Sequence, residues 1–236
     1  MQIADMHNHI LPGMDDGCAD ISDSIAALQS AREQGVEHLF LTPHYYAPEP
    51  VEEFLRRRNE AMDRLTPHIP EGMQLCLGAE VAFFSGISRC LELEKLCLGN
   101  SRYMLLEMPF GPWDSNVCRE LQNLIYICGI QPILAHVERY LRLQSRTSLK
   151  QILEQDVLVQ MNGNFLLDKR SGREGRRMLR QGKAHLLGSD CHNNTQRSFN
   201  LGSAMDTLEK HRLTSQLQQV AALSMDIFRS ATSKKG

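Results

Sequence analysis

Short apolar runs alternate with amphipathic segments along the whole chain. Runs such as 103–106 and 131–135 are largely apolar and have a length typical of buried strands. In the segments between them, apolar residues fall at helical spacing, as Ile25, Leu28 and Ala31 do. Strands that alternate with helices predict a parallel sheet covered by helices, so the expected fold class is α/β. The predicted helices lie at residues 20–35, 49–65, 88–96, 114–128, 147–155, 173–181, 199–210 and 214–230.

The length of the chain favours one domain. A chain of 236 residues suits a single α/β barrel, and 42% hydrophobic residues suffice for a sizeable core. The sequence contains neither an internal repeat nor a linker-like segment. We therefore predict a single domain over residues 1–236, with a flexible tail from about residue 230.

Charge and cysteine content exclude several classes of protein. The formal net charge of -2 excludes a strongly basic protein that coats nucleic acid, so no nucleic-acid partner is expected. The seven cysteines form no Cys-x-x-Cys pair, and a reducing, cytoplasmic location is the simpler interpretation. No apolar stretch approaches the roughly 20 residues that span a bilayer, so no direct membrane insertion is expected.

Six of the apolar runs end at residues that bind divalent cations. The carboxyl ends of parallel strands converge at one face of a (β/α) barrel, where active sites lie. We therefore expect these side chains to meet in space, although they are far apart in the sequence. A seventh run, 156–161, ends at Asn162. The residues at the six other ends are His7 with His9, His44, Glu80, Glu107, His136, and Asp190 with His192.

Imidazole and carboxylate side chains together predict a metal cluster. A polar residue at a single strand end satisfies a local hydrogen bond about as often as it binds a metal. Six such ends together favour a metal site. Mixed nitrogen and oxygen ligands suit manganese, iron or zinc better than calcium. The loop after the first strand adds Asp16, and nine candidate groups exceed what one ion binds, so two or three ions are expected. Asp5, two residues before His7, is expected to orient an imidazole from outside the cluster.

The motifs around these residues, in this order along the chain, resemble the PHP (polymerase and histidinol phosphatase) superfamily. Two of them are specific to its bacterial tyrosine phosphatase branch of capsule and exopolysaccharide synthesis. These are the spacing from His7-Asn-His9 to the Asp-Asp-Gly of residues 15–17, and the run His-Val-Glu-Arg-Tyr at 136–140. The other motifs are Thr42-Pro-His44, Gly78-Ala-Glu80, Leu106-Glu107 and Gly188-Ser-Asp190-Cys-His192-Asn. The resemblance extends from Gln2 to about Leu201.

The resemblance implies a distorted (β/α)7 barrel of the PHP type, with a metal cluster at the C-terminal ends of the strands. It also implies three divalent metal ions, with manganese first and iron, zinc or magnesium as alternatives. The ligands of the first ion would be His7, His9, Glu80 and Asp190. Those of the second would be Glu80, Glu107 and His136, and those of the third Asp16, His44 and His192. Arg139 and Arg197 match the phosphate-binding arginines of the family, so the residues expected in catalysis are Arg139, Arg197, Asp190 and His192.

The implied activity is that of a protein-tyrosine phosphatase, a phosphoric monoester hydrolase. A metal cluster lowers the pKa of a bound water from about 15.7 to about 7, which gives a hydroxide that attacks phosphorus. The two arginines would neutralise the phosphoryl oxygens. The resemblance implies that the substrate is the phosphorylated, tyrosine-rich tail of a membrane-associated bacterial tyrosine kinase, and that the enzyme regulates polysaccharide synthesis. Whether the chain forms a homo-oligomer is left open.

Other activities fit the sequence less well. A histidinol phosphatase or another small-molecule phosphomonoesterase of the same fold is the main alternative. A nuclease is disfavoured by the negative charge, and a catalytically silent metal scaffold by the intact ligands and arginines. Residues 191–198 also match the Cys-x5-Arg-Ser pattern of thiol-based tyrosine phosphatases. That loop lacks glycine, and its second residue is the predicted ligand His192, so we interpret the match as chance.

Aromatic and basic residues near the predicted ligands are candidates for substrate contacts. We hypothesise that some of the aromatic residues pack against a phosphotyrosine ring, whereas packing in the core is an equally frequent alternative. Two basic stretches, 56–58 and 169–183, are typical of solvated helix faces, and holding an acidic, phosphorylated tail is the alternative. The aromatic residues that follow three of the ligands are Tyr45, Tyr46, Phe83, Phe84, Phe110 and Trp113.

Overall fold

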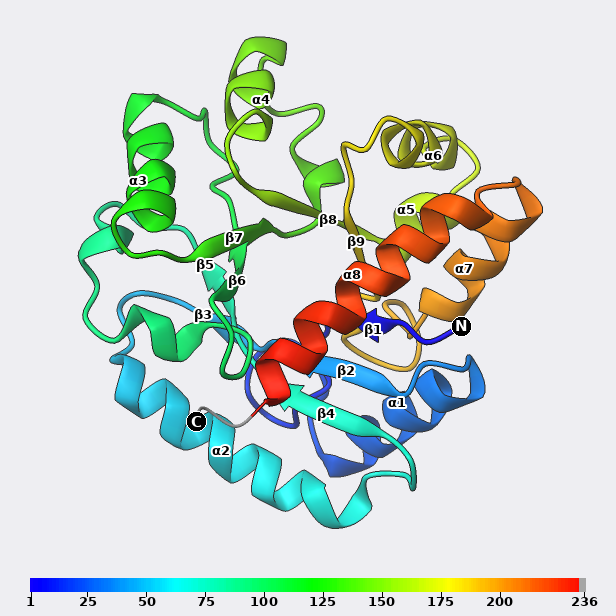
Figure 1. Cartoon of the computed structure of the whole chain (residues 1–236). Helices are drawn as coiled ribbons and strands as arrows, with labels where there is room; N and C mark the ends of the chain where they lie inside the picture. The colour runs from blue at the N-terminus through cyan, green and yellow to red at the C-terminus, as the bar shows by residue number, and fades with distance from the viewer. Residues whose placement is uncertain (234–236) are drawn as a thin grey trace.

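Parallel strands form the centre of the molecule, and helices surround them (Figure 1). The computed structural model describes residues 1–233. The strands are β1 (Ala4–Asp5), β2 (His38–Leu41), β3 (His44–Tyr45), β4 (Gln74–Leu77), β5 (Glu80–Ala82), β6 (Tyr103–Glu107), β7 (Gln131–Leu134), β8 (Leu158–Asn162) and β9 (Leu186–Gly188). One sheet has the order β1-β2-β4 and the other the order β3-β5-β6-β7-β8-β9, and every pairing is parallel. The predicted α/β class with a parallel sheet is confirmed.

The two sheets are linked because two stretches of chain pass from one sheet to the other. Thr42 and Pro43 separate β2 from β3, and Gly78 and Ala79 separate β4 from β5. Pro43 has no backbone N–H, so it interrupts the hydrogen-bond ladder between neighbouring strands. A Cβ at Gly78 would lie 2.5 Å from the Cδ2 of Leu98, so a larger residue at the second break would force the buried Leu98 side chain to move.

Hydrogen bonds also return from the last strand to the first. The backbone N–H of His9 donates to the carbonyl of Cys191 (2.8 Å), and that of Asp190 donates to the carbonyl of His7 (2.7 Å). Asn8 and Cys191 form a parallel bridge between the same two segments. The first strand therefore has β2 on one side and the segment after β9 on the other, and the parallel sheet curls until its ends meet.

Helices pack on the outside of this curled sheet. They are α1 (Ile21–Glu33), α2 (Val51–Leu65), α3 (Ser115–Tyr126), α4 (Arg146–Leu153), α5 (Gly163–Leu167), α6 (Gly172–Arg180), α7 (Leu201–Lys210) and α8 (Thr214–Thr232). The side chains of Asp20, Asp114 and Ser145 accept hydrogen bonds from the first turns of α1, α3 and α4, which fixes where these helices begin. Seven predicted helices agree with these bounds to within about two residues. Among residues 1–233, no helix is both long and apolar enough to cross a membrane.

The predicted helix at 88–96 is wrong. The segment forms two 3-10 turns, η2 (Ile87–Arg89) and η3 (Leu93–Leu96). Between them Cys90 is extended and Glu92 is left-handed with φ 62°, so no continuous helical ladder forms. Further 3-10 turns, η1 (Thr66–His68) and η4 (Val137–Arg139), and the short α5 lack the longer periodic pattern that predicts a helix. α8 continues to Thr232, and residues 234–236 of the predicted flexible tail lie outside the described residues.

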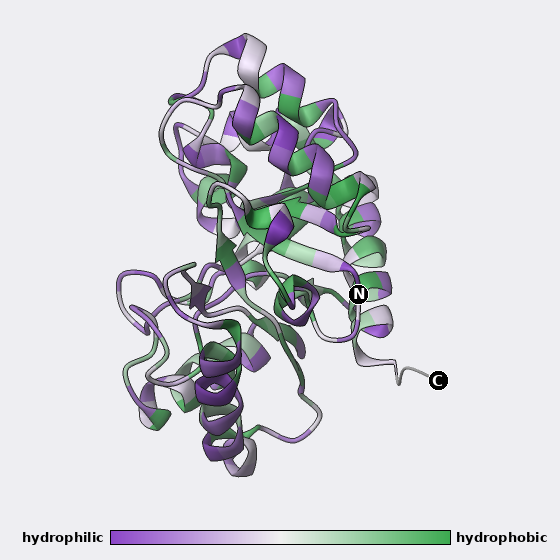
Figure 2. Ribbon diagram, turned by 90° about the vertical axis from the view of Figure 1, so that its left-hand side faces the viewer, coloured by the Kyte–Doolittle hydropathy of each residue, from purple (hydrophilic) through white to green (hydrophobic). Residues whose placement is uncertain are grey.

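The core has two parts, one inside the curled sheet and one between the sheet and its helices. The inner part contains strand residues such as Met6, Phe40 and Ile133 together with Phe228 of α8. α8 crosses one end of the strands (red in Figure 1), where the N–H of Ala4 donates to the Oγ of Ser224 (3.1 Å). Figure 2 shows the hydrophobic strands at the centre and hydrophilic residues on the outer helix faces. Because α8 covers the N-terminal ends of the strands, a polar site can form at their C-terminal ends.

Candidate metal centre

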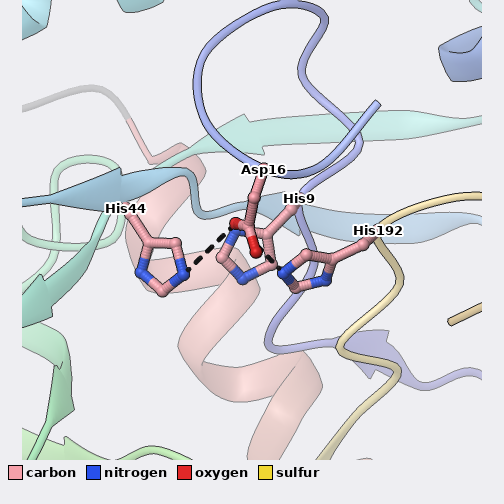
Figure 3. Close-up of side chains that lie close together, drawn as sticks. All are labelled: His9, Asp16, His44 and His192. Carbon is pink, nitrogen blue, oxygen red and sulfur yellow. Dashed lines mark ion pairs between the residues drawn. The ribbon is translucent and has the colours of Figure 1, made fainter. Parts of the chain in front are cut away.

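The nine predicted ligands lie close together where the strands end. Eight of them fall into three overlapping groups, and within each group the ligand atoms lie within 4.8 Å of one another. Figure 3 shows four of these side chains, from the loop after β1, from β3 and from the segment after β9, that point toward one another. The groups are His9, Asp16, His44 and His192; His7, His9 and Asp190; and His44, Glu80 and Glu107. His136 joins them through Glu80 Oε1 (2.8 Å) and Glu107 Oε1 (3.3 Å).

Glu80, the first residue of β5, lies at the middle of the cluster. Its Oε2 is 2.9 Å from His7 Nε2, 3.2 Å from His9 Nε2 and 3.2 Å from His44 Nδ1. Its Oε1 is 2.8 Å from His136 Nε2. Burial raises the pKa of this carboxyl, but the charge of His7 and hydrogen bonds from the imidazoles hold it well below its usual range. One ionised carboxylate therefore faces four imidazoles.

Asp190 connects the cluster to the two predicted phosphate-binding arginines. Arg139 donates to its Oδ2 (2.7 Å), and Arg197 donates to its Oδ1 (2.8 Å). Burial raises the pKa of Asp190, but the charges of His7, His9 and both arginines hold it well below its usual range. Each guanidinium keeps about a third of its side chain exposed, so its other N–H donors can meet an anion at the cluster.

The loop after β1 brings two further carboxylates to the cluster. Asp16 is exposed, and its Oδ1 lies 3.6 Å from His44 Nε2 and 3.4 Å from His192 Nε2. Asp15 lies deeper and accepts a hydrogen bond from His9 Nδ1 (2.7 Å). The loop folds back so closely that a Cβ at Gly17 would lie 2.1 Å from the carbonyl oxygen of His9. The glycine of the Asp-Asp-Gly motif is therefore needed for this approach.

Two outer contacts set the proton positions on His7 and His9. The Oε1 of Gln160 accepts a hydrogen bond from the backbone N–H of His136 (2.8 Å) and lies 3.2 Å from His7 Nδ1. His7 Nδ1 must therefore donate, and Asp15 fixes His9 Nδ1 as a donor in the same way. With a cation bound in place of the Nε2 protons, the Nε2 atoms of the two rings, which lie 3.1 Å apart, would both point lone pairs into the cluster. Such outer partners are typical of metal-bound histidines.

The donor set fits divalent cations. Among residues 1–233, the buried His44 Nδ1 and His192 Nε2 make no hydrogen bond, although carboxylate oxygens of Glu80 and Asp16 lie 3.2 and 3.4 Å from them. Buried polar atoms are normally paired. Burial lowers the pKa of His192 to about 4, so its ring is neutral and able to bind a cation. Burial also lowers the pKa of His9, but hydrogen bonds to Asp15 and Glu80 raise it to about 10. A bound cation would replace the proton that these carboxylates hold on His9.

Two of the predicted ligands have an unusual backbone. His136 has φ 31° and Asp190 has φ 52°, which is the left-handed region that non-glycine residues seldom adopt. Such conformations cost about 1–3 kcal/mol each and cluster at functional sites. Here they turn each side chain at the end of its strand toward the centre of the cluster.

The sequence did not reveal the residues that orient His7 and His9 from outside the cluster, and the role was assigned to Asp5 instead. Asp5 was expected to orient an imidazole, and this is wrong. Its carboxylate accepts from the backbone N–H and the hydroxyl of Ser189 (both 2.7 Å), so it joins β1 to the segment after β9. The partners of His7 and His9 are Gln160 and Asp15 instead. Gln160 is a fully buried polar residue in an otherwise largely apolar strand, and that was the signal that could have identified it.

Replacing Gln160 with leucine is expected to weaken metal binding by about 10–100-fold, because outer partners of metal-bound histidines contribute that much. Leucine removes the acceptor that fixes both the proton on His7 and the backbone of His136. Competition with a chelating dye measures the affinity. Gln160→Glu, which keeps an acceptor oxygen, should lose less. Equal affinities for Gln160→Leu and the unchanged chain would show that His7 is oriented by other contacts.

The curled parallel α/β sheet and the cluster of imidazoles, carboxylates and arginines define an α/β protein with a candidate metal centre suited to phosphate chemistry. The chain belongs to the CpsB/CapC family of capsular polysaccharide synthesis, whose model matches residues 3–226. The family resemblance predicted from the motifs is confirmed.

Named relatives and a solved structure agree with this family. The chain is 31% identical over 221 residues to the tyrosine-protein phosphatase YwqE of Bacillus subtilis (strain 168), which covers 87% of this chain and 84% of that protein. It is 27% identical over 206 residues to the tyrosine-protein phosphatase CpsB of Streptococcus agalactiae serotype V, covering 80% and 82%. The solved structure comes from work on YwqE and Streptococcus pneumoniae CpsB, described as metal-dependent tyrosine phosphatases. It matches with a TM-score of 0.81 and 24% identity, over 99% of this chain and 97% of the other. The fold is therefore shared.

Proposed function

We propose that this chain is a metal-dependent protein-tyrosine phosphatase that hydrolyses phosphotyrosine on a bacterial tyrosine kinase and so regulates capsular or extracellular polysaccharide synthesis. Family membership and the named relatives bear out the tyrosine phosphatase prediction. The observation that carries the proposal is the position of Arg139 and Arg197, which meet at Asp190 on the edge of the metal-binding side chains.

The fold that we propose is a distorted (β/α)7 barrel of the PHP type, formed as one domain by residues 1–236. If β2 continues as β3 and β4 as β5, the sheet has seven strand positions. The hydrogen bonds between His9 and Cys191 and between Asp190 and His7 support closure of such a barrel. The metal cluster would lie at the C-terminal ends of its strands.

We propose three divalent ions at this centre, manganese first, with iron, zinc or magnesium as alternatives. Their donor atoms are nitrogen and oxygen, which suits this class of ion. When bound, the ions would supply Lewis acidity and lower the pKa of the attacking water. The proposed sets are His7, His9, Glu80 and Asp190; Glu80, Glu107 and His136; and Asp16, His44 and His192. Glu80 belongs to two sets, in agreement with its contacts to four imidazoles.

The residues of the chain itself would bind and orient the phosphoryl group. Arg139 and Arg197 each present a planar fork of N–H donors that matches phosphoryl oxygens. Asp190 holds one nitrogen of each fork, which aims the remaining donors over the cluster. As the phosphorus–phenolate bond breaks, negative charge on the phosphoryl oxygens is stabilised by these donors. His192 and Asp190 take part as proposed ligands.

Two exposed aromatic residues flank the centre. Tyr46 is 52% exposed and stacks on His44, with ring centroids 5.3 Å apart, and Phe110 is 50% exposed. Phe110 contacts Tyr140, which in turn contacts His136, each with centroids 5.7 Å apart. Of the other aromatic candidates, Tyr45 and Trp113 are buried and belong to the core, whereas Phe83 and Phe84 are half-buried against it. Tyr46 and Phe110 are therefore placed to contact the ring of a phosphotyrosine.

Replacing Tyr46 or Phe110 with alanine is expected to lower kcat/KM for phenyl phosphate more than for an alkyl phosphate. An aromatic pair contributes about 0.5–1.5 kcal/mol, which corresponds to a loss of about 2–13-fold. Tyr46→Phe keeps the ring and should retain the preference for the aryl substrate. Steady-state kinetics on both substrates measure the ratio, and equal losses on the two would argue against ring contact.

Replacing Cys191 with serine is expected to leave turnover of phosphotyrosine largely intact. The thiol is buried, and burial raises its pKa far above neutral pH, so the thiolate that a cysteine phosphatase needs does not form. This favours the metal mechanism over the thiol pattern of residues 191–198. Phosphate release by the Cys191→Ser variant measures this, together with its metal content. Loss of turnover with the metals still bound would contradict the metal mechanism.

The proposed partner is the phosphorylated, tyrosine-rich tail of a membrane-associated bacterial tyrosine kinase, and we propose no nucleic-acid partner. The described cysteines are all free thiols, which supports the proposed cytoplasmic location. The test is phosphate release from a phosphotyrosyl peptide and from histidinol phosphate in the presence of Mn²⁺. Preference for the peptide is expected. Preference for histidinol phosphate would keep the fold and the metals but assign the chain to small-molecule metabolism.

A further inference from the structure

A groove of about 910 Å³ lies between α4 and α6, outside the metal centre. In Figure 1, both helices lie on the outside of the sheet, on the side of β8 and β9. Its lining combines charged and polar side chains with apolar ones, which include Leu149, Leu153, Val159 and Met178. A groove that offers both apolar and charged side chains can accommodate a polypeptide segment.

A second groove of about 340 Å³ continues the first toward the metal centre. Leu141 and Glu174 line both grooves, so they are contiguous. The lining of the second groove includes Glu138, the residue before Arg139. The backbone N–H of Asn162 donates to the Glu138 carboxylate (3.3 Å), and the side chain of Asn162 donates to Asp190 (2.7 Å). The two grooves therefore form one track that starts beside the phosphate-binding arginines.

The track is lined by six basic and four acidic side chains, so positive charge is in excess. Within residues 1–233, the exposed side chains of Arg142, Arg146, Arg170 and Lys183 form no ion pair, although all four line the grooves. Lys150 and Arg177 also line the track, but Lys150 pairs with Glu154 and Arg177 pairs with Glu174. Apolar side chains beside an excess of basic ones complement a polypeptide that carries both acidic and apolar residues. A single-stranded nucleic acid would instead require stacking aromatics, and Phe165 is the one aromatic residue lining these described grooves.

We propose that this track, the α4–α6 groove and its extension to Glu138, binds an acidic segment of the protein substrate adjacent to the phosphotyrosine. This rests on the proposed phosphatase function and adds the place where the substrate polypeptide is recognised. The phosphotyrosine would lie at the metal centre, and the chain that flanks it would follow the track over β8. Small aryl phosphates would bind without using the track.

The test reverses two of the unpaired charges, in the double variant Arg146→Glu/Lys183→Glu. Both side chains are exposed and form no side-chain hydrogen bond or ion pair within residues 1–233, so folding should be preserved. The matched control, Arg32→Glu/Lys210→Glu, makes the same change of charge on α1 and α7, which do not line the track. The substrates are a phosphotyrosyl peptide flanked by aspartate and glutamate, the same peptide with glutamine at those positions, and phenyl phosphate.

The groove variant should lower kcat/KM for the acidic peptide by about tenfold, since each reversal exchanges a weak attraction for a weak repulsion. Phenyl phosphate turnover should not change, and high salt should shrink the effect. An unchanged kcat/KM on the acidic peptide, or an equal loss in the control variant, would overturn the proposal. If the unmodified chain hydrolyses none of the substrates, the proposed function fails. Fluorescence anisotropy of the labelled acidic peptide, with the same expected loss of affinity, then tests the track alone.

Discussion

Replacing Glu80 with glutamine is expected to lower kcat/KM for a phosphotyrosyl peptide by about a thousandfold. Its buried carboxylate lies within 3.2 Å of ring nitrogens of four histidines: His7, His9, His44 and His136. Glutamine keeps the shape of the side chain but removes the charge that would hold divalent ions between these rings. Metal ions contribute several kcal/mol to the transition state, and a loss of about 4 kcal/mol corresponds to about a thousandfold in rate.

The Glu80→Gln variant should also bind less metal, and elemental analysis of the purified protein measures this beside the kinetics. Glu120→Gln provides a matched control. Glu120 is another buried carboxylate, but it accepts hydrogen bonds from the backbone and hydroxyl of Ser88 on the outside of the sheet. The control should keep both its metal and its activity. Normal metal content and turnover in Glu80→Gln would contradict the assignment of Glu80 as the shared ligand.

Replacing Arg197 with alanine is expected to lower kcat by about 10²–10³-fold, by analogy with the loss of one donor to a transition-state oxyanion. This corresponds to about 2.7–4 kcal/mol of transition-state stabilisation. Arg197 donates to Asp190 at 2.8 Å and lies 3.8 Å from Asp16, so it sits between two proposed ligands of different ions. A phosphoryl group at the cluster would meet its free N–H donors.

Arg197→Lys separates charge from geometry at this position. Lysine keeps the positive charge but lacks the planar fork, so its kcat should fall between those of alanine and arginine. Metal content should stay normal in both variants, which distinguishes loss of phosphate binding from loss of ions. If Arg197→Ala retains full kcat with its metals bound, then phosphate is held by other groups.

That the candidate metal ligands lie together at strand ends could be predicted from the sequence, because it depends on local patterns. Each proposed strand-end ligand follows a short apolar run, and parallel strands bring such ends together whatever the details of packing. His44 and Glu80 follow short breaks at Pro43 and Gly78 that shift them from one sheet to the other. The sequence contains these residues but does not predict that the strands break there. Only the structure shows that β3 and β5 pair with each other after the breaks.

The outer partners could not be predicted because they depend on contacts between distant parts of the chain. Gln160 orients His7 across 153 residues of sequence, and Asp5 meets Ser189 across 184. Nothing local distinguishes Asp15 from Asp16, yet one binds His9 from outside and the other faces two imidazoles. The prediction of a helix at 88–96 was wrong for a different reason. The left-handed backbone of Glu92 interrupts a pattern that is otherwise helical.

The most direct test of the central claim is phosphate release from a phosphotyrosyl peptide by protein stripped of metal with a chelator, measured before and after Mn²⁺ is added. The cluster of imidazoles and carboxylates around Glu80 predicts that stripped protein is inactive and that Mn²⁺ restores turnover. Turnover that survives complete removal of metal, as verified by elemental analysis, would contradict the metal-dependent mechanism.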